Sequence, residues 1–245
     1  MHPILAAQLA DDYCCTVDQV QSPENTFSVL EPRPGQRGLG DPFRAACVDG
    51  KLLVAGSPEM AAWCRERYAQ KEAAWFMEFS VLRALNERLN ADGLRIATAH
   101  PFFLPAHPVR PCTDGLTITW YEQEEIGQFR GDGRFGEAYA FLPDAPDVLG
   151  VSASIDGELC AMAGASRDSA RMWQIGIDVQ PAYRRRGLGS ALTALLAREV
   201  ERRGALPFYG TSMSHIASQR VALRAGFEPA WTELYAERMA EHKES

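Results

Sequence analysis

Three consecutive arginines stand immediately before a glycine-rich turn in the C-terminal half of the chain. The segment reads VQPAYRRRGLGSAL, with Arg184, Arg185 and Arg186 followed by Gly187 and Gly189. A helix N-terminus leaves backbone N–H groups unpaired and carries partial positive charge, and glycine lets a bulky anion approach the main chain. The segment therefore predicts a local anion site with room for a pyrophosphate.

Two common nucleotide motifs do not fit this segment. A Walker A loop requires Gly-Lys-Ser/Thr, and RRRGLGSAL contains no lysine. A dinucleotide fingerprint requires a third glycine where Leu192 stands, together with an acidic residue at the end of the next strand, which is missing. A lone Arg-x-x-Gly-x-Gly is equally typical of a solvated surface turn. The surrounding elements must decide between the two interpretations.

Strand patterns lead into the turn. Residues 115–129 indicate a strand followed by an acidic helix. Residues 148–155 and 158–165 indicate two strands joined by Asp-Gly, a pair favoured in tight hairpins. A third strand, RMWQIGIDV, covers residues 171–179 and ends just before the turn. We therefore expect a meander that delivers the chain to the anion site.

The pattern changes to a helical period after the turn. Leu188, Leu192, Leu196 and Val200 recur at every fourth position, and Gly204 is placed to end the helix. A strand LPFYGTS, a helix IASQRVALRAG and a last strand near WTELYA follow. From residue 148 the predicted order is β-β-β-α-β-α-β.

The N-terminal half is predicted to be α/β, without a chemical motif. Residues 3–15 and 75–90 have helical periodicity, and residues 57–70 begin with a Ser cap and a Pro at the first helical position. Residues 43–56 form two apolar runs around an Asp-Gly pair, which predicts a hairpin. Four prolines in PFFLPAHPVRPC, residues 101–112, predict a connector. We predict two domains, residues 1–112 and 113–245.

The bulk composition argues against several classes of protein. A net charge of -7 disfavours general binding to nucleic acid or to anionic membranes. No apolar run approaches the length of about 18 residues that a membrane span needs. The 6 cysteines contain no C-x-x-C pair, and the 5 histidines show no pattern of metal ligands. We expect a cytoplasmic protein with reduced cysteines, no metal and no signal peptide.

The turn and its neighbours together resemble a known family. VQPAYRRRGLGSAL is similar to the acyl-CoA binding motif of the GNAT superfamily of N-acetyltransferases, Arg/Gln-x-x-Gly-x-Gly/Ala, with Arg184, Gly187 and Gly189 at the patterned positions. MWQIGIDV resembles the family's fourth strand, and SHIASQRVALRAGF resembles its later helix. The resemblance covers about residues 113 to 236. It implies an α/β (α+β) fold with a mixed, mostly antiparallel central sheet flanked by helices, preceded here by an α/β N-terminal domain.

The resemblance also implies acetyl-CoA as a cosubstrate. In this family two central strands splay apart, and the pantetheine arm pairs with exposed main chain of the fourth strand. The pyrophosphate lies on N–H groups of the turn, and an N–H near Val179 could polarise the thioester carbonyl. The residues predicted to bind the coenzyme are Ile177, Val179, Arg184, Arg185, Arg186, Gly187, Leu188, Gly189, Ser190, His215 and Ser218.

The proton donor departs from the family pattern. Relatives often use a tyrosine to protonate the departing thiolate, and Ala222 stands at that position here, while His215 replaces the usual asparagine. A thiol has a reference pKa of about 8.5, so thiolate can leave without a donor. Tyr209 or Ser218 could substitute for the missing tyrosine.

Removal of the proton from the acceptor amine needs a base. The candidates are Asp178, at the end of the third strand, and Glu137 in FGEAYAF. Asp178 could instead stabilise the turn, Glu137 could lie on a solvated face, and His215 could cap a helix or contact the coenzyme. The predicted catalytic set is Asp178, His215 and Tyr209.

These residues favour an enzyme that transfers acetyl to a small-molecule or peptide amine by direct attack. A non-catalytic acyl-CoA sensor or interaction module is the alternative, and a nucleotide phosphate-binding protein is the third. Trp173, Trp231 and Tyr235 are expected in the core rather than in an acceptor pocket. Residues 1–112 either cover the acceptor side or mediate self-association as a homodimer, and the sequence does not choose between these roles.

Overall fold

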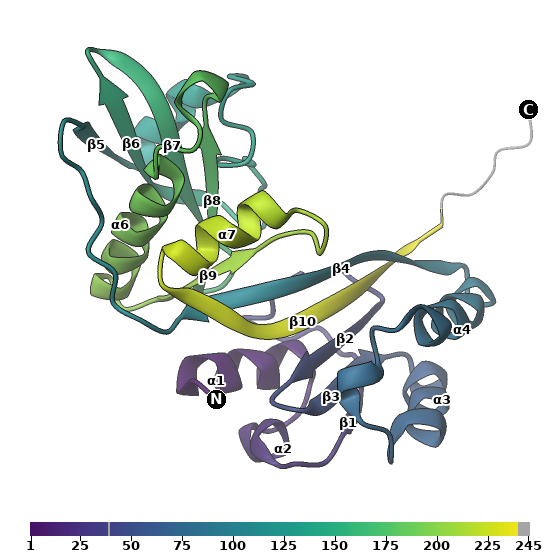
Figure 1. Cartoon of the computed structure of the whole chain (residues 1–245). Coiled ribbons are helices and arrows are strands. Elements are labelled where there is room, and N and C mark those ends of the chain that lie inside the picture. The colour runs from purple at the N-terminus through teal and green to yellow at the C-terminus, as the bar shows by residue number, and fades with distance from the viewer. Residues whose placement is uncertain (39, 240–245) are drawn as a thin grey trace, which may run out of the picture. The chain divides into compact units, whose positions relative to one another are not determined.

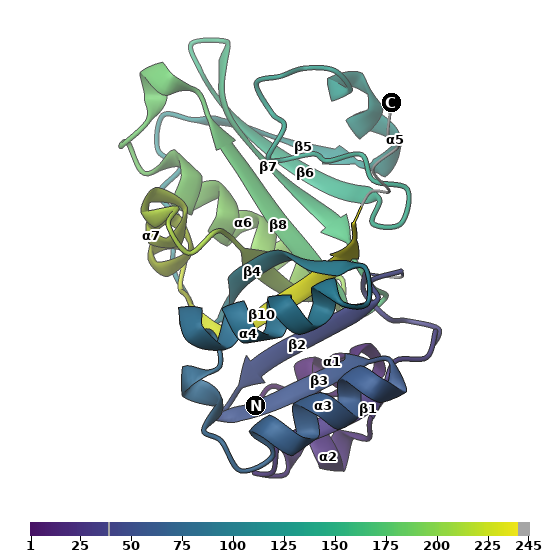
Figure 2. The same cartoon turned by 90° about the vertical axis from the view of Figure 1, so that its right-hand side faces the viewer.

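The computed structural model describes residues 1–38 and 40–239 (Figures 1 and 2). The chain forms two compact units: unit 1 holds Met1–Pro101 and Ala230–Ser245, and unit 2 holds Phe102–Pro229. The described residues form seven α-helices and ten strands, paired in a mixed and mostly antiparallel manner. This confirms the predicted fold class. The predicted domain division after residue 112 stays a prediction.

Unit 1 is an α/β unit. Its elements are α1 (Pro3–Asp12), α2 (Val17–Gln21), β1 (Thr26–Val29), β2 (Phe43–Val48), β3 (Lys51–Gly56), α3 (Pro58–Tyr68), the 3-10 turn η1 (Ala73–Trp75) and α4 (Phe79–Asn90). The strand order is β1-β3-β2-β10, with β1 parallel to β3. The hairpin turns at Asp49 and Gly50, with φ of 46° and 78°, as predicted. Ser57 accepts the N–H of Met60, which confirms the predicted cap of α3.

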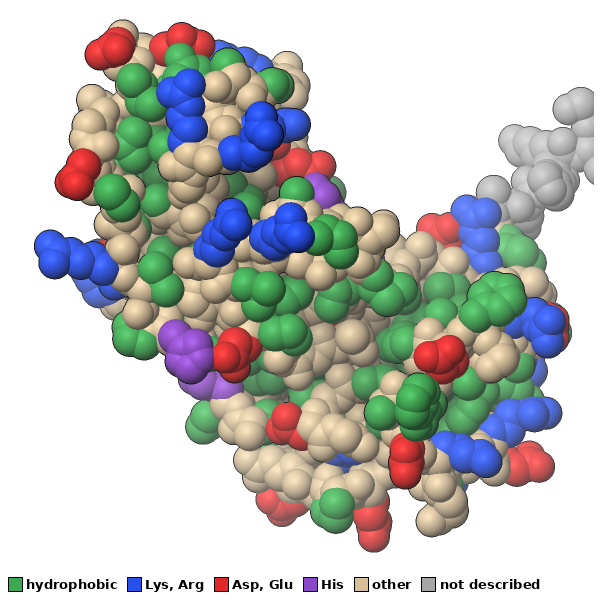
Figure 3. Space-filling model, viewed as in Figure 1, with side chains coloured by type: hydrophobic (Ala, Val, Ile, Leu, Met, Phe, Trp, Pro, Cys, Tyr) green, Lys and Arg blue, Asp and Glu red, His purple; other side chains and the backbone are tan. Residues whose placement is uncertain are grey.

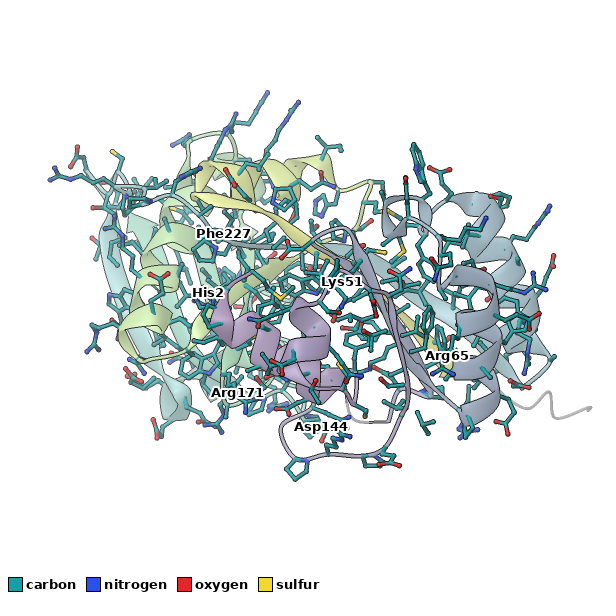
Figure 4. The ribbon with its side chains drawn as sticks, turned by 90° about the horizontal axis from the view of Figure 1, so that it is seen from below. His2, Lys51, Arg65, Asp144, Arg171 and Phe227 are labelled. Carbon is teal, nitrogen blue, oxygen red and sulfur yellow. The ribbon has the colours of Figure 1, made fainter. Side chains whose placement is uncertain are left out.

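Two cationic side chains hold α2 and β1 in unit 1 (Figure 4). Lys51 Nζ donates to the carbonyl oxygens of Gln19 and, at 3.0 Å, of Ser22. Arg65 Nη2 donates to the carbonyl of Phe27 at 2.7 Å. These contacts link residues far apart in the sequence, so the local pattern did not reveal α2 or β1.

A buried ionic network joins the two ends of unit 1 in sequence. Arg37 Nη2 lies 2.7 Å from Asp12 Oδ2 and 2.8 Å from Glu233 Oε1. Arg44 Nη2 donates to the carbonyl of Arg37 at 2.7 Å and to Asp41 at 3.1 Å. Burial raises the pKa of Asp12, and the guanidinium groups of Arg37 and Arg44 oppose this. The arginines therefore compensate the buried carboxylates.

Unit 2 contains the elements predicted from residue 115 onward, except the last strand near WTELYA, whose residues 231–236 lie in unit 1. They are β5 (Thr117–Glu122), α5 (Gln123–Ile126), the 3-10 turn η2 (Gly127–Phe129), β6 (Asp147–Ile155), β7 (Glu158–Arg167), β8 (Met172–Val179), the 3-10 turn η3 (Pro181–Tyr183), α6 (Leu188–Arg202), β9 (Leu206–Gly210) and α7 (Ile216–Arg224). The strand order is β4-β9-β8-β7-β6-β5, and β8 and β9 are parallel. Strands β4 (Leu94–Pro105) and β10 (Phe227–Arg238) have residues in both units.

Helix α6 packs on the sheet of unit 2 as its period predicts. Leu188, Leu192, Leu196 and Val200 are all buried, and α6 contacts β6, β7, β8 and β9 (Figure 1). Gly204 follows the helix with φ of 84°, a conformation that glycine adopts without strain. The apolar face thus fixes the position of the turn at the start of α6.

The first part of the predicted connector is strand, which corrects the expectation for residues 101–105. Strand β4 runs to Pro105, and Phe102 and Phe103 pair in register with Gly210 and Tyr209 of β9. Both phenylalanines are buried. Their burial outweighs the N–H donors that the flanking prolines lack. Residues 106–112 form no helix or strand, as expected of a connector.

Candidate functional site

Strands β8 and β9 are paired along only part of their length. The described pairing joins Met172–Gln174 to Leu206–Phe208, while β8 continues to Val179 with its other edge on β7. In the described chain, the edge of Ile175–Val179 that faces away from β7 therefore has no neighbouring strand. An extended ligand with amide groups can add to such an edge as another strand would. Ile177 and Val179, predicted from sequence, lie on this edge.

The turn after β8 presents backbone N–H groups at the N-terminus of α6. Arg185 and Gly187 have positive φ, 65° and 84°. Within the described chain, no acceptor contacts the backbone N–H of Gly187, Leu188, Gly189 or Ser190. These donors and the positive end of the helix dipole favour an anion at this point. The turn is thus suited to hold the diphosphate of a coenzyme.

The two glycines of the turn serve different purposes. A Cβ at Gly187 would meet nothing within 4 Å, so glycine is needed here for its positive φ. A Cβ at Gly189 would lie 3.3 Å from Val221 Cγ2 and 3.4 Å from Val179 Cγ2. Gly189 therefore allows the start of α6 to approach both β8 and α7.

The three arginines have different partners. Arg184 Nε donates to the carbonyl of Val179 at 3.1 Å and closes the end of β8. The guanidinium of Arg186 lies 5.1 Å from the ring centroid of Tyr183. Arg185 is exposed. Lys and Arg side chains lie over α7 and above the end of β8 in Figure 3. Positive charge is thus concentrated locally although the chain carries a net charge of -7.

Tyr209 and Ser218 form a hydroxyl pair beside the unpaired part of β8. Their oxygens are 2.8 Å apart, and Tyr209 is buried. Burial raises the pKa of Tyr209; the hydrogen bond with Ser218 opposes this, and the negative charges of Glu137 and Asp178 add to it. The structure therefore brings together three of the residues predicted from sequence, Tyr209, Ser218 and Asp178. Their hydroxyl and carboxyl groups can donate and accept protons.

Asp178 holds a segment of main chain. Its Oδ2 accepts the backbone N–H of Glu137 at 2.8 Å and of Ala138 at 3.0 Å. Burial raises the pKa of Asp178, and these two hydrogen bonds oppose the rise. The contacts correspond to the structural alternative considered for this residue, although they tie down residues 137–138 rather than the turn before α6.

A row of three glycines receives the segment that Asp178 holds. Gly150, Gly164 and Gly176 are register partners on β6, β7 and β8. A Cβ at Gly176 would lie 1.9 Å from the carbonyl oxygen of Glu137, and one at Gly164 would lie 2.1 Å from that of Ala138. The segment therefore lies directly on the sheet. Sequence analysis missed this row, although glycine inside a strand is a known signal of close backbone approach.

His215 is not brought into the hydroxyl pair. It occupies the N-cap position of α7, but its side chain makes no capping hydrogen bond and is exposed. Trp231 is buried and Trp173 packs against the core of unit 2, as expected, while Tyr235 is half-buried. Within the described part of the chain, His, Cys, Asp and Glu form no group that could hold a metal ion. No described helix is long and apolar enough to cross a membrane.

The family comparison agrees with this geometry. Residues 116–227 match the model of the acetyltransferase (GNAT) family. These residues form a GNAT acetyltransferase domain. The domain includes β8, the N–H turn and the hydroxyl pair. No curated protein matches the chain.

Several solved structures resemble the chain in fold. A GCN5-related N-acetyltransferase from Kribbella flavida is 22% identical, with a TM-score of 0.44, over 66% of this chain and 65% of its own. A GCN5-related N-acetyltransferase-like protein from Streptococcus suis is 16% identical, with a TM-score of 0.46, over 84% and 90%. The yncA protein of Salmonella typhimurium, solved with its cofactor acetyl-CoA, is 14% identical, with a TM-score of 0.37, over 53% and 97%.

Proposed function

We propose that this protein is an N-acetyltransferase that transfers acetyl from acetyl-CoA to an amine by direct attack. The observation that carries the proposal is the adjacency, within a GNAT domain, of a free strand edge at Ile175–Val179 and the open N–H turn at 187–190. The turn binds the diphosphate, and the strand edge pairs with the amides of the pantetheine arm. The thioester then lies in the gap between β8 and β9, beside Tyr209.

In the proposed reaction, the amine nitrogen attacks the thioester carbonyl carbon and the carbon–sulfur bond breaks. The hydroxyl of Tyr209 donates its proton to the departing thiolate and replaces the family tyrosine, whose position is Ala222. Because burial raises the pKa of Tyr209, this hydroxyl carries its proton at neutral pH. Ser218, 2.8 Å away, orients it.

Glu137 faces the acceptor in this scheme. Its main chain rests on Gly176 of β8, its N–H is held by Asp178, and its carboxylate is exposed. An amine is mostly protonated at neutral pH, with a reference pKa of about 10.4 for lysine, so it arrives as a cation and must lose a proton. Glu137 attracts that cation and accepts the proton. Asp178 acts as a positioning residue.

The alternative is a non-catalytic acyl-CoA sensor, which Ala222 at the tyrosine position favours. A melting-temperature screen with acetyl-CoA, ATP and NAD, followed by thiol-release assays with a panel of amines, separates these functions. We expect stabilisation by acetyl-CoA and release of CoA thiol with at least one amine. Stabilisation without thiol release would support the sensor. Stabilisation by ATP or NAD alone would contradict both.

A further inference from the structure

Segment 137–141, which lies on the row of glycines, is held by a carboxylate at each end. Asp178 holds the first end through two backbone N–H groups. At the second end, Asp147 Oδ2 accepts the backbone N–H of Phe141 at 2.8 Å. Asp178 belongs to β8 and Asp147 is the first residue of β6. The segment is therefore attached to the sheet at two points on two different strands.

A β-bulge turns the side chain of Asp147 toward this segment. Asp147 and Leu149 pair with consecutive residues of β7, so Val148 is an extra residue in β6. In a regular strand Asp147, three positions before Gly150, would lie on the opposite face of the sheet from it. The extra residue reverses this alternation, and the carboxylate reaches the face on which the segment lies.

The environment of Asp147 is closed around its carboxylate. Asp147 is buried. Burial raises its pKa, and hydrogen bonds from the backbone N–H groups of Phe141 and Ala140, together with the positive charge of Arg130, oppose this rise. The guanidinium of Arg130 also lies 4.3 Å from the ring centroid of Phe141. Because a buried carboxylate needs such partners, Asp147 and the second end of the segment fix each other in place.

The backbone of the segment could not keep this position alone. Phe141 has a positive φ of 52°, an uncommon conformation for a residue with a bulky side chain, which persists only where the surrounding structure holds it. Between the two ends, Tyr139 is buried, and its hydroxyl donates to Met162 Sδ at 3.3 Å. A Cβ at Gly150 would lie 1.8 Å from the hydroxyl oxygen of Tyr139. The middle of the segment thus fills its site on the sheet, and Asp147 holds the strained end.

We propose that Asp147 is a positioning residue for the amine acceptor, an inference that rests on the proposed function. Asp147 and Asp178 together fix the segment that carries Glu137, the proposed acceptor-side carboxylate. When the second end is released, the segment lifts from the glycines and Glu137 loses its fixed position. Strand β7 separates Asp147 from the free edge of β8. Asp147 therefore acts on the amine through the segment and leaves the binding of acetyl-CoA unchanged.

Steady-state kinetics of Asp147→Ala and Asp147→Asn, with acetyl-CoA and the best amine of the panel, test this role. We expect Asp147→Ala to raise the KM for the amine about tenfold, as the loss of one hydrogen bond to a charged group provides. The KM for acetyl-CoA stays at the wild-type value. Asp147→Asn keeps an acceptor oxygen for the N–H of Phe141 and recovers most of the affinity for the amine.

Asp144→Ala is the matched control, because it removes a carboxylate from an exposed position three residues earlier in the same loop (Figure 4). It keeps the wild-type KM for both substrates. Hydrogen exchange at the backbone N–H groups of residues 140 and 141 follows the segment directly. Exchange there becomes faster in Asp147→Ala, while exchange in α6 stays slow and shows that the fold is intact.

An unchanged KM for the amine in Asp147→Ala, or an equal rise in KM for both substrates, overturns the role of Asp147 and leaves the proposed function standing. If Asp147→Ala does not fold, Asp147→Leu, which has a similar shape and no acceptor, is measured by the same criteria. Loss of the fold in both variants assigns Asp147 to stability and overturns the proposal. If the wild-type protein acetylates no amine, the proposed function fails, and this inference fails with it.

Discussion

At the scale of single residues, the proposed chemistry depends on a hydroxyl supplied by a strand. The family position for the proton donor lies on α7 and is Ala222, which has no polar group. Tyr209 on β9 is hydrogen-bonded to Ser218 of α7. In the proposed mechanism the donor therefore lies on a strand, and its hydrogen-bond partner lies on the helix.

We expect Tyr209→Phe to lower kcat about 10²-fold, near the lower end of general acid catalysis, because thiolate leaves readily. Affinity for acetyl-CoA should change little, since the hydroxyl is not part of the binding turn. Steady-state kinetics with the best amine of the panel measures both. Tyr121→Phe is the matched control, because Tyr121 forms a similar pair with Ser152 at 3.1 Å. Equal kcat in wild type and Tyr209→Phe would remove the hydroxyl from the mechanism.

The pH dependence of kcat gives a second test of the same residue. Burial raises the pKa of Tyr209, so its proton is lost only above the usual tyrosine pKa. A proton donor acts only while it is protonated, so kcat should fall at high pH. This fall should occur above the pH at which an ordinary tyrosine loses its proton, and it should be absent in Tyr209→Phe. An identical high-pH limb in both proteins would assign it to another group.

The turn before α6 requires glycine at Gly187 for backbone reasons. A valine there must adopt a φ of 84°, which costs roughly 1–2 kcal/mol for a residue with a Cβ, and its side chain would enter the space proposed for the diphosphate. We expect Gly187→Val to abolish the melting-temperature shift caused by acetyl-CoA. Gly204→Val, with the same φ at the other end of α6, is the control and should keep the shift. A shift of wild-type size in Gly187→Val would place the diphosphate elsewhere.

At the scale of elements, the row of glycines across β6, β7 and β8 determines where residues 137–139 lie. Each added Cβ would meet this segment at less than 2.2 Å, two of them at backbone carbonyl oxygens. The backbone cannot move away from an added Cβ as the end of a flexible side chain can. The row therefore couples the sheet to Glu137, the proposed acceptor-side carboxylate.

We expect Gly164→Ala to destabilise the protein by about 1–3 kcal/mol, the cost of overpacking a filled site. The segment must also move, so the KM for the amine should rise more than that for acetyl-CoA. Urea unfolding and steady-state kinetics measure the two effects. Gly133→Ala, where a Cβ meets nothing within 4 Å, should leave both unchanged. Unaltered stability of Gly164→Ala would contradict the close approach of the segment.

The sequence predicts elements whose signals are local. The hairpin at Asp156 and Gly157, the apolar face of α6 and the end of that helix at Gly204 are read from neighbouring residues, and the structure confirms them. The row of glycines could not be predicted in this way, because it depends on the register of three strands. No single segment of the sequence contains that register. The strand at residues 101–105 of β4 could not be predicted, because its prolines are typical of a connector. The burial of the phenylalanines between them depends on β9. In the site, the turn could be predicted, but the partners of Asp178 could not.

At the scale of the whole molecule, the last strand returns to the first unit. Glu233 of β10 contacts Arg37, which also contacts Asp12 of α1, so residues from the start and the end of the sequence meet in one buried network. All three side chains are buried. The C-terminal strand therefore completes the buried network of unit 1, although it follows the GNAT domain in the sequence.

Replacing the central cation tests how far unit 1 depends on this network. Arg37→Met fills similar volume but leaves Asp12 and Glu233 buried without their cation, and we expect a loss of about 3–5 kcal/mol in the free energy of unfolding.

The pKa of Asp12, already raised by burial, should rise further, because Arg37 opposes that rise. A carboxyl whose folded-state pKa lies above its unfolded value destabilises the folded protein as pH rises through that range. The variant should therefore lose less stability at acidic pH than at neutral pH, in contrast to Arg83→Met, an exposed control on α4. Denaturant unfolding at two pH values measures this difference, and a uniform, small loss at both would mean that the network contributes little to folding.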